Sequence, residues 1–265
     1  MRRRDYLTGM ISLGVLGATS ACIGTDSVLD SSISATEPTL PPLPDRLNQY
    51  VNNGSFRGAL GQSVPFGNSP PGNKEEELAR EVINLCPANK KPVEIAQFFV
   101  GLSNGDFGEE YRPYAREWPE IWNPVIVEFF SSTHTKPSGD VTPWCAAFVN
   151  WCILRAKSDR TPSSSLSNGS RSASSGSFRS WGEKIHPNAT ADLGDVVVFE
   201  RTDPILSAKG FGHVGFYLQQ TDDLIHVLGG NQLDAKLGYG SVNKKWFKKR
   251  GSLLKLHSIR HVDIL

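Results

Sequence analysis

Residues 142–152 read TPWCAAFVNWC and predict an apolar helix with a cysteine near its start. Thr142 is a favourable N-cap and Pro143 a favourable first helical residue, which would place Cys145 at the third helical position. Backbone N–H groups at a helix start lack intrahelical partners, and the helix dipole there favours negative charge. A thiol in this position is expected to have a lowered pKa and to act as a nucleophile. The alternative interpretation of Cys145 is a small core residue.

His213, in the stretch GFGHVGFY, is the histidine best placed to serve such a thiolate as a base. Glycines on both sides leave its imidazole room, and the alternating run 213–219 predicts a strand that His213 opens. The next predicted strand ends in LGGNQ. If these two strands pair, Asn231 can reach the second imidazole nitrogen and orient the ring. Gln232 and Asp195 are the other candidates for the orienting group.

Helices are expected first along the chain and strands later. Three helices are predicted ahead of the Cys145 helix, with Asn73 capping the first, the second at 92–101, and Asn123 capping the third. Runs rich in β-branched and aromatic residues predict strands at 195–200, 213–219 and 224–230, with a further run near 252–259. Helices followed by adjacent strands indicate an α+β fold in which an antiparallel sheet packs on the Cys145 helix.

The N-terminal residues are predicted to be an export signal peptide rather than part of the folded domain. Residues 1–21 combine a basic start, with Arg3 and Arg4 in a twin-arginine pattern, and an apolar run too short to span a bilayer. TSAC resembles a lipobox, which would make Cys22 a lipidation site, although Thr19 stands where leucine is usual. Residues 22–72 are rich in Ser, Thr, Pro and Gly and are interpreted as a flexible tether.

Residues 73–265 then form the expected catalytic domain with an N-terminal helical segment. The formal net charge of +1 gives no global signal for a nucleic-acid partner. Four cysteines are too few for a disulfide scaffold. Cys86 and Cys152 are the spare pair, and a bond between them stays open. No Cys/His spacing resembles a zinc site, so no metal or other cofactor is expected. The basic run 243–250 is interpreted as a solvated strand edge or turn, with contact to anionic wall polymers as the alternative.

Five motifs in order, TPWCAAFVNWC, RSWGEK, GDVVVF, GHVGFY and LGGNQ, resemble the CHAP and NlpC/P60 group of papain-like cysteine peptidases and amidases. The resemblance implies a papain-like fold and cleavage of amide bonds in peptidoglycan stem peptides, by an endopeptidase or an N-acetylmuramoyl-L-alanine amidase. It implies Cys145 as the nucleophile, His213 as the general base and then acid, and Asn231 as the orienting group. The flanking residues expected to bind substrate are Trp144, Gly212, Tyr217 and Gln232.

The expected partner is therefore a peptidoglycan peptide, and the protein is expected to be a monomer. It is expected to be exported to the periplasm or cell surface, and to be anchored to the membrane if Cys22 is lipidated. Two other functions fit the same residues. One is a non-catalytic module that binds wall peptides in the same cleft. The other is a thiol acyltransferase, which shares the nucleophile and base but passes the acyl group to an acceptor other than water.

Overall fold

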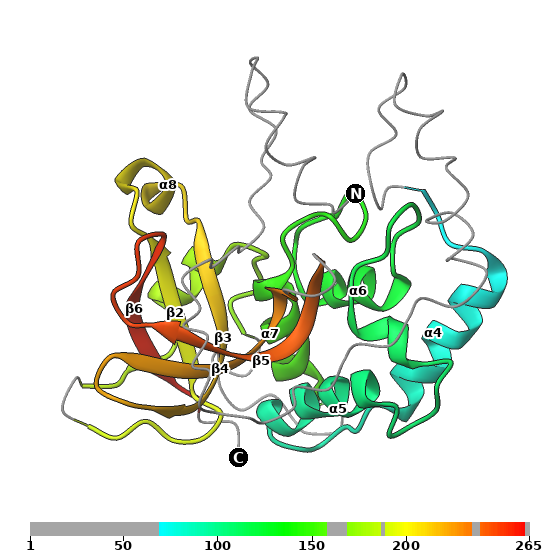
Figure 1. The fold of residues 1–265 in the computed structure, drawn as a ribbon, viewed down its shortest axis with the longest axis horizontal. Coiled ribbons are helices and arrows are strands. Elements are labelled where there is room, and N and C mark those ends of the chain that lie inside the picture. The colour runs from blue at the N-terminus through cyan, green and yellow to red at the C-terminus, as the bar shows by residue number, and fades with distance from the viewer. Residues whose placement is uncertain (1–68, 158–168, 187–188, 235–238, 263–265) are drawn as a thin grey trace.

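The computed structural model describes residues 69–157, 169–186, 189–234 and 239–262. The predicted export signal, Cys22 and nearly all of the predicted tether lie outside these ranges. Within them, helices come from the first part of the chain and a sheet from the second, so the α+β prediction is confirmed (Figure 1). No helix of the described residues is long and apolar enough to cross a membrane.

Four helices of the first part follow the predicted order: α4 (Asn73–Leu85), α5 (Pro92–Asn104), α6 (Pro124–Phe129) and α7 (Cys145–Arg155). The start of α6 is as predicted, because the Asn123 side chain accepts a hydrogen bond from the backbone N–H of Val125. Asn73, expected as a cap, is instead the first residue of α4. The second helix continues past Gly101 and ends at Gly105, whose left-handed φ of 85° favours glycine.

The strands form one antiparallel sheet in the order β1-β6-β2-β3-β4-β5. Their bounds are β1 (Glu183–Lys184), β2 (Val196–Arg201), β3 (Gly212–Gln220), β4 (Leu224–Leu233), β5 (Gly240–Lys248) and β6 (Leu254–His261). The short helix α8 (Pro204–Ala208) connects β2 to β3. The stretch interpreted as a solvated edge or turn thus lies largely in β5, which forms an edge of the described sheet.

Helix α7 lies between the sheet and the other helices (Figure 1) and contacts α5, α6, β3 and β4. One hydrophobic cluster joins these helices to one face of the sheet, where Val214 and Phe216 of β3 lie. A second cluster covers the other face and includes Phe199 and Phe247. Strand alternation therefore divides the side chains of β3 between two apolar environments.

Asp140 fixes the loop that leads into α7. Its Oδ2 accepts hydrogen bonds from the backbone N–H groups of Trp118, at 2.9 Å, and Asn123, at 2.8 Å. The carboxyl group is fully buried, and among the described residues its Oδ1 has no hydrogen-bond partner. Burial raises the pKa of Asp140 well above its ordinary value, despite the opposing effect of these N–H groups. The charged form of this carboxyl therefore costs stability.

We expect Asp140→Asn to stabilise the protein at neutral pH. The folded state holds the Asp140 proton more tightly than the unfolded chain, so the free energy of unfolding falls as the pH rises from about 4 toward the raised pKa. Asparagine keeps an oxygen for the two N–H groups and has no proton to lose. Thermal unfolding at pH 7 and at pH 4 tests this: the variant should melt higher at pH 7, and the difference should shrink at pH 4. A variant that melts lower than the wild type at both values would contradict it.

Candidate active site

Helix α7 begins at Cys145 itself, two residues later than predicted. Trp144 is the flanking residue, and the first helical hydrogen bond runs from the Phe148 N–H to the Trp144 carbonyl at 2.9 Å. The Thr142 hydroxyl, expected to cap the helix, instead accepts a hydrogen bond from the Ser138 N–H at 2.9 Å. The N–H groups of the first three helical residues therefore have no carbonyl partner within α7. Cys145 lies at the positive end of the helix, as the prediction requires.

The other two described cysteines are chemically different from a nucleophile. Cys86 and Cys152 are buried free thiols, so no disulfide joins them in the structure, and Cys145 is also buried, at 2% exposed. Burial raises the pKa of Cys86 to about 12. Burial, and secondarily the nearby Cys86, raises the pKa of Cys152 well above its ordinary value. Both thiols therefore stay protonated near neutral pH and are poor nucleophiles.

Glu117 and Asn231 hold the start of α7. The Trp144 indole N–H donates to Glu117 Oε1 at 2.9 Å. The Asn231 amide is oriented so that donors face acceptors. Its nitrogen then donates to the same Glu117 oxygen at 3.1 Å, and its oxygen accepts from the backbone N–H of Trp144 at 3.2 Å. The other Glu117 oxygen accepts from the Gly240 N–H at 2.9 Å. Trp144, the residue that precedes Cys145, is thus hydrogen-bonded to Asn231 of β4 and, through Glu117, linked to Gly240 of β5.

A glycine brings this helix end close to the sheet. A Cβ atom at Gly230 would lie 2.3 Å from the Trp144 ring and 2.9 Å from the Phe148 Cβ. Any side chain at this position of β4 would therefore push the first turn of α7 away. The LGGNQ motif supplies both the space for the helix and the amide that holds it.

His213 lies on β3, fully buried, with its ring near Phe199 and Phe247 at centroid distances of 6.4 Å and 5.2 Å. Its Nε2 lies 3.2 Å from Gln232 Oε1. The Gln232 amide nitrogen donates to the Asn243 side-chain oxygen at 2.9 Å and also to the Asn243 backbone carbonyl. These two acceptors fix the amide with its oxygen toward the imidazole.

This orientation determines the histidine tautomer. Gln232 Oε1 can only accept, so the His213 Nε2 carries the proton and Nδ1 is left with a lone pair. Among the described residues, Nδ1 has no hydrogen-bond partner, although it is buried. An imidazole with a fixed Nε2–H and an unbonded Nδ1 has the arrangement of a general base.

The amide that lies beside the His213 ring is therefore that of Gln232, the other candidate, and not that of Asn231. A β-bulge explains the exchange: Gly229 pairs with Asn243 and Gln232 with Ser241, so β4 carries one extra residue. Asn231 has a left-handed φ of 57° within this bulge. Its side chain turns toward Trp144, while that of the next residue turns toward His213.

The bulge gives two neighbouring amides two different tasks. Asn231 holds the start of the Cys145 helix, and Gln232 holds the imidazole from the other side of the strand. His213 packs with the second cluster, whereas Cys145 belongs to the cluster around α7. The structure thus connects Cys145 and His213 through the end of β4, not through a direct hydrogen bond to His213 Nδ1.

The expected substrate-binding side chains lie mostly in the core. Trp144 is fully buried and Tyr217 is 7% exposed, so both rings pack against protein in this structure. Gly212 packs against β2, where an added Cβ would lie 2.0 Å from the Phe199 carbonyl oxygen.

The sequence analysis did not predict Glu117 as part of the site, because nothing in REWPEIW marks it as a partner of Trp144, 27 positions away.

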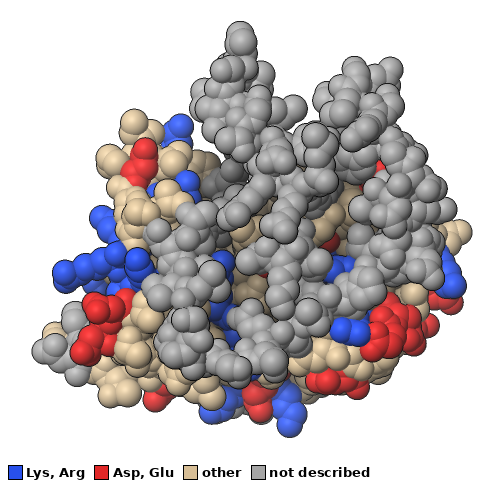
Figure 2. All heavy atoms as spheres, viewed as in Figure 1, with Lys and Arg blue, Asp and Glu red and all other residues tan. Residues whose placement is uncertain are grey.

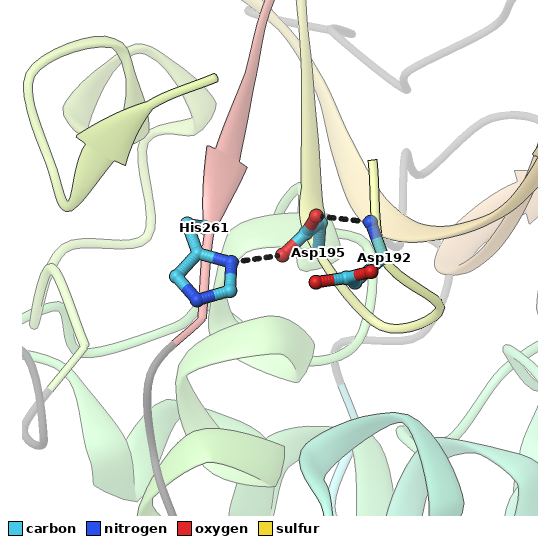
Figure 3. A group of neighbouring side chains, drawn as sticks. All are labelled: Asp192, Asp195 and His261. Carbon is cyan, nitrogen blue, oxygen red and sulfur yellow. Dashed lines mark hydrogen bonds and ion pairs between the residues drawn. The ribbon is translucent and has the colours of Figure 1, made fainter. Parts of the chain in front are cut away.

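Asp195, the remaining candidate for the orienting role, has other partners (Figure 3). Its Oδ1 lies 3.1 Å from His261 Nδ1 and accepts from the Val262 N–H at 3.2 Å, and its Oδ2 accepts from the Asp192 N–H at 2.6 Å. One ligand-type atom from each of Asp192, Asp195 and His261 lies within 4.8 Å of the others, the only such group of three found in the described residues. The hydrogen bonds account for this arrangement without an ion. Asp195 joins the start of β2 to the end of β6.

The fold and these contacts define a class of protein in which a cysteine begins a helix packed on an antiparallel sheet that carries a fixed histidine. Residues 137–231 match the family model of the CHAP domain, so the resemblance to this family is confirmed for that part of the chain. CHAP domains are typically hydrolases that act on peptidoglycan. The match ends at Asn231, one residue before Gln232. No curated protein and no solved structure matches the chain.

Proposed function

We propose that this protein is an exported cysteine hydrolase that cleaves amide bonds in peptidoglycan stem peptides. Cys145 is the nucleophile, His213 is the general base and then acid, and Gln232 holds the imidazole. The observation that carries the proposal is the bulge at the end of β4, where adjacent amides fix the start of the cysteine helix and the histidine ring. The CHAP match over residues 137–231 supports the same chemistry.

In the first half of the proposed reaction, His213 Nδ1 takes the proton of the Cys145 thiol and the sulfur attacks the amide carbonyl. The carbonyl carbon gains a C–S bond, and its oxygen becomes an oxyanion close to the backbone N–H groups at the start of α7, which have no carbonyl partner within the helix. The intermediate collapses to a thioester as the C–N bond breaks. The leaving amine takes the proton from His213.

Water completes the cycle. His213 Nδ1 removes a proton from a water molecule, whose oxygen attacks the thioester carbonyl. The C–S bond then breaks, a carboxylic acid leaves, and the proton returns to the sulfur. The Nε2–H bond to Gln232 persists through both halves, because Nδ1 performs every proton transfer. The products are one new amine and one new carboxylic acid for each amide bond.

Purified sacculi provide the test of the reaction class. Incubation with the protein should release fragments with new amino groups, detected by amine derivatisation, and no new reducing sugar ends. The fragment masses would distinguish an endopeptidase from an N-acetylmuramoyl-L-alanine amidase. New reducing ends without new amino groups would show glycosidic cleavage and would contradict the proposal.

The three described thiols should differ sharply in reactivity. All three thiols are buried, but only Cys145 lies at a helix start, so we expect iodoacetamide at pH 7.5 to alkylate Cys145 in the native protein and to spare Cys86 and Cys152, whose pKa values burial raises. Digestion followed by mass spectrometry identifies the modified peptide. Denatured protein serves as the control, in which all cysteines should react. Preferential labelling of Cys152 over Cys145 in the native state would contradict the assignment of the nucleophile.

A further inference from the structure

Strand β5 exposes a basic face at the edge of the described sheet. Lys244, Trp246 and Lys248 alternate to the same side of the strand and lie opposite residues 228, 226 and 224 of β4. Lys248 is exposed, and the other two are partly exposed. We call these three residues, together with His226, the β5 basic face.

An aromatic platform occupies the middle of the β5 basic face. The rings of Trp246 and His226 stack with a centroid distance of 4.6 Å and an interplanar angle of 7°. Burial, and secondarily the charge of Lys244, lowers the pKa of His226, which leaves the ring neutral at pH 7. The stacking fixes the orientation of the indole ring, so that little conformational entropy is lost when a ligand packs against it.

Within the part of the chain that the structure describes, no carboxylate forms an ion pair with the lysines of this face, Lys244 and Lys248. Lys255 of the neighbouring strand β6, by contrast, pairs with Glu200 at 3.1 Å. Lys and Arg side chains gather at the left of the view in Figure 2, over the end of the sheet where Figure 1 shows β5 leading to β6.

The pattern of charge and ring indicates the chemistry of a partner. Lysines on an edge strand also protect it from pairing with other strands, but that task does not require a stacked tryptophan between them. Four residues of extended chain separate Lys244 and Lys248 by about 13 Å. Two cations at this spacing with an aromatic ring between them suit a chain whose negative groups alternate with uncharged rings. A sugar polymer with acidic groups has this character, and CHAP domains typically act on a polymer that contains sugar.

We propose that the β5 basic face binds an anionic glycan, with Lys244 and Lys248 pairing with its acidic groups and a sugar ring packing against Trp246. None of these residues takes part in the proposed Cys145 chemistry. Binding here would hold the protein on the polymer while the thiol acts elsewhere, and it requires no catalytic residue.

Titration with four defined polymers tests the proposal: hyaluronan oligosaccharides, neutral dextran, polyphosphate and single-stranded oligothymidylate. We expect the protein to bind hyaluronan, more weakly as salt rises, and not to bind dextran. The double variant Lys244→Glu/Lys248→Glu should bind hyaluronan about tenfold more weakly. Trp246→Ala should weaken hyaluronan binding about fivefold and leave polyphosphate binding unchanged.

The matched control is Lys184→Glu/Lys209→Glu, which makes the same change in net charge at exposed positions on β1 and after α8. It should bind hyaluronan like the wild type, and unchanged melting temperatures would establish that all variants fold. Lys244→Gln/Lys248→Gln replaces the charge reversal if the latter unfolds. Hyaluronan affinity that is unchanged in the β5 variants, or equally reduced in the control, would overturn the proposal. Tighter binding of oligothymidylate than of hyaluronan would also overturn it, in favour of a nucleic acid.

Discussion

Replacing Cys145 by alanine is expected to lower amide hydrolysis of sacculi by at least about 10⁴-fold, because the thioester cannot form without the sulfur. The variant should keep the wild-type fold and melting temperature to within a few degrees, since it removes one small atom from the start of a helix. Release of amino groups over time, at equal protein concentrations, is the measurement.

The matched control is Cys152→Ala, which removes the same atom seven residues later in α7. Its thiol is fully buried and its pKa is raised by burial, so we expect a loss of stability of about 1 kcal/mol and activity near that of the wild type. Equal activity of Cys145→Ala and the wild-type protein would end the assignment of the nucleophile. Equal loss in both variants would point to a packing defect instead.

Replacing Gln232 by leucine is expected to lower kcat by about 10² to 10⁴-fold, because the imidazole loses the acceptor that fixes its tautomer. Leucine is close in size but leaves the buried Nε2–H of His213 unpaired. Gln232→Glu should keep part of the activity, since a carboxylate oxygen also accepts from Nε2. The added negative charge favours imidazolium, so the acidic limb of the pH–rate profile should move to higher pH.

The variant Asn231→Ala distinguishes the role of the Asn231 amide from that of Gln232. Its loss removes a hydrogen bond to the Trp144 N–H and one to Glu117, so we expect lower stability by about 1 kcal/mol and an unshifted pH profile. A profile shifted by substitutions at Asn231 but not by Gln232→Glu would restore the original assignment of the orienting group. Comparing pH profiles matters here, because a purely structural role does not move them.

Local patterns predicted the elements well where one segment determines its own structure. Asn123 followed by Pro124 gives a helix start that needs no distant partner, and the runs at β2, β3 and β4 alternate as strands do. The confirmed resemblance at residues 137–231 likewise rests on contiguous motifs. The start of α7 was misplaced because two favourable capping residues precede it, while the structure uses Thr142 in the loop.

The site depended on features that a sequence does not display. A bulge shifts which of two adjacent amides faces His213, and the positive φ of Asn231 carries no mark in GGNQ. Glu117 meets Trp144 and Gly240 only because the fold brings the segment before α6 against β5. The sequence did not predict β5 as a strand because it is rich in lysine, which has a low strand propensity. Its strand conformation depends on pairing with β4 at the edge of the sheet.

The central claim is that Cys145 and His213 act as one acid–base pair. The most direct test is the rate of Cys145 alkylation by iodoacetamide from pH 4 to pH 10, in the wild type and in His213→Ala. We expect the wild type to react well below pH 7, because an imidazolium stabilises the thiolate, and His213→Ala to react only at higher pH, where the helix start alone lowers the thiol pKa from about 8.5. Superimposable profiles for the two proteins would contradict it.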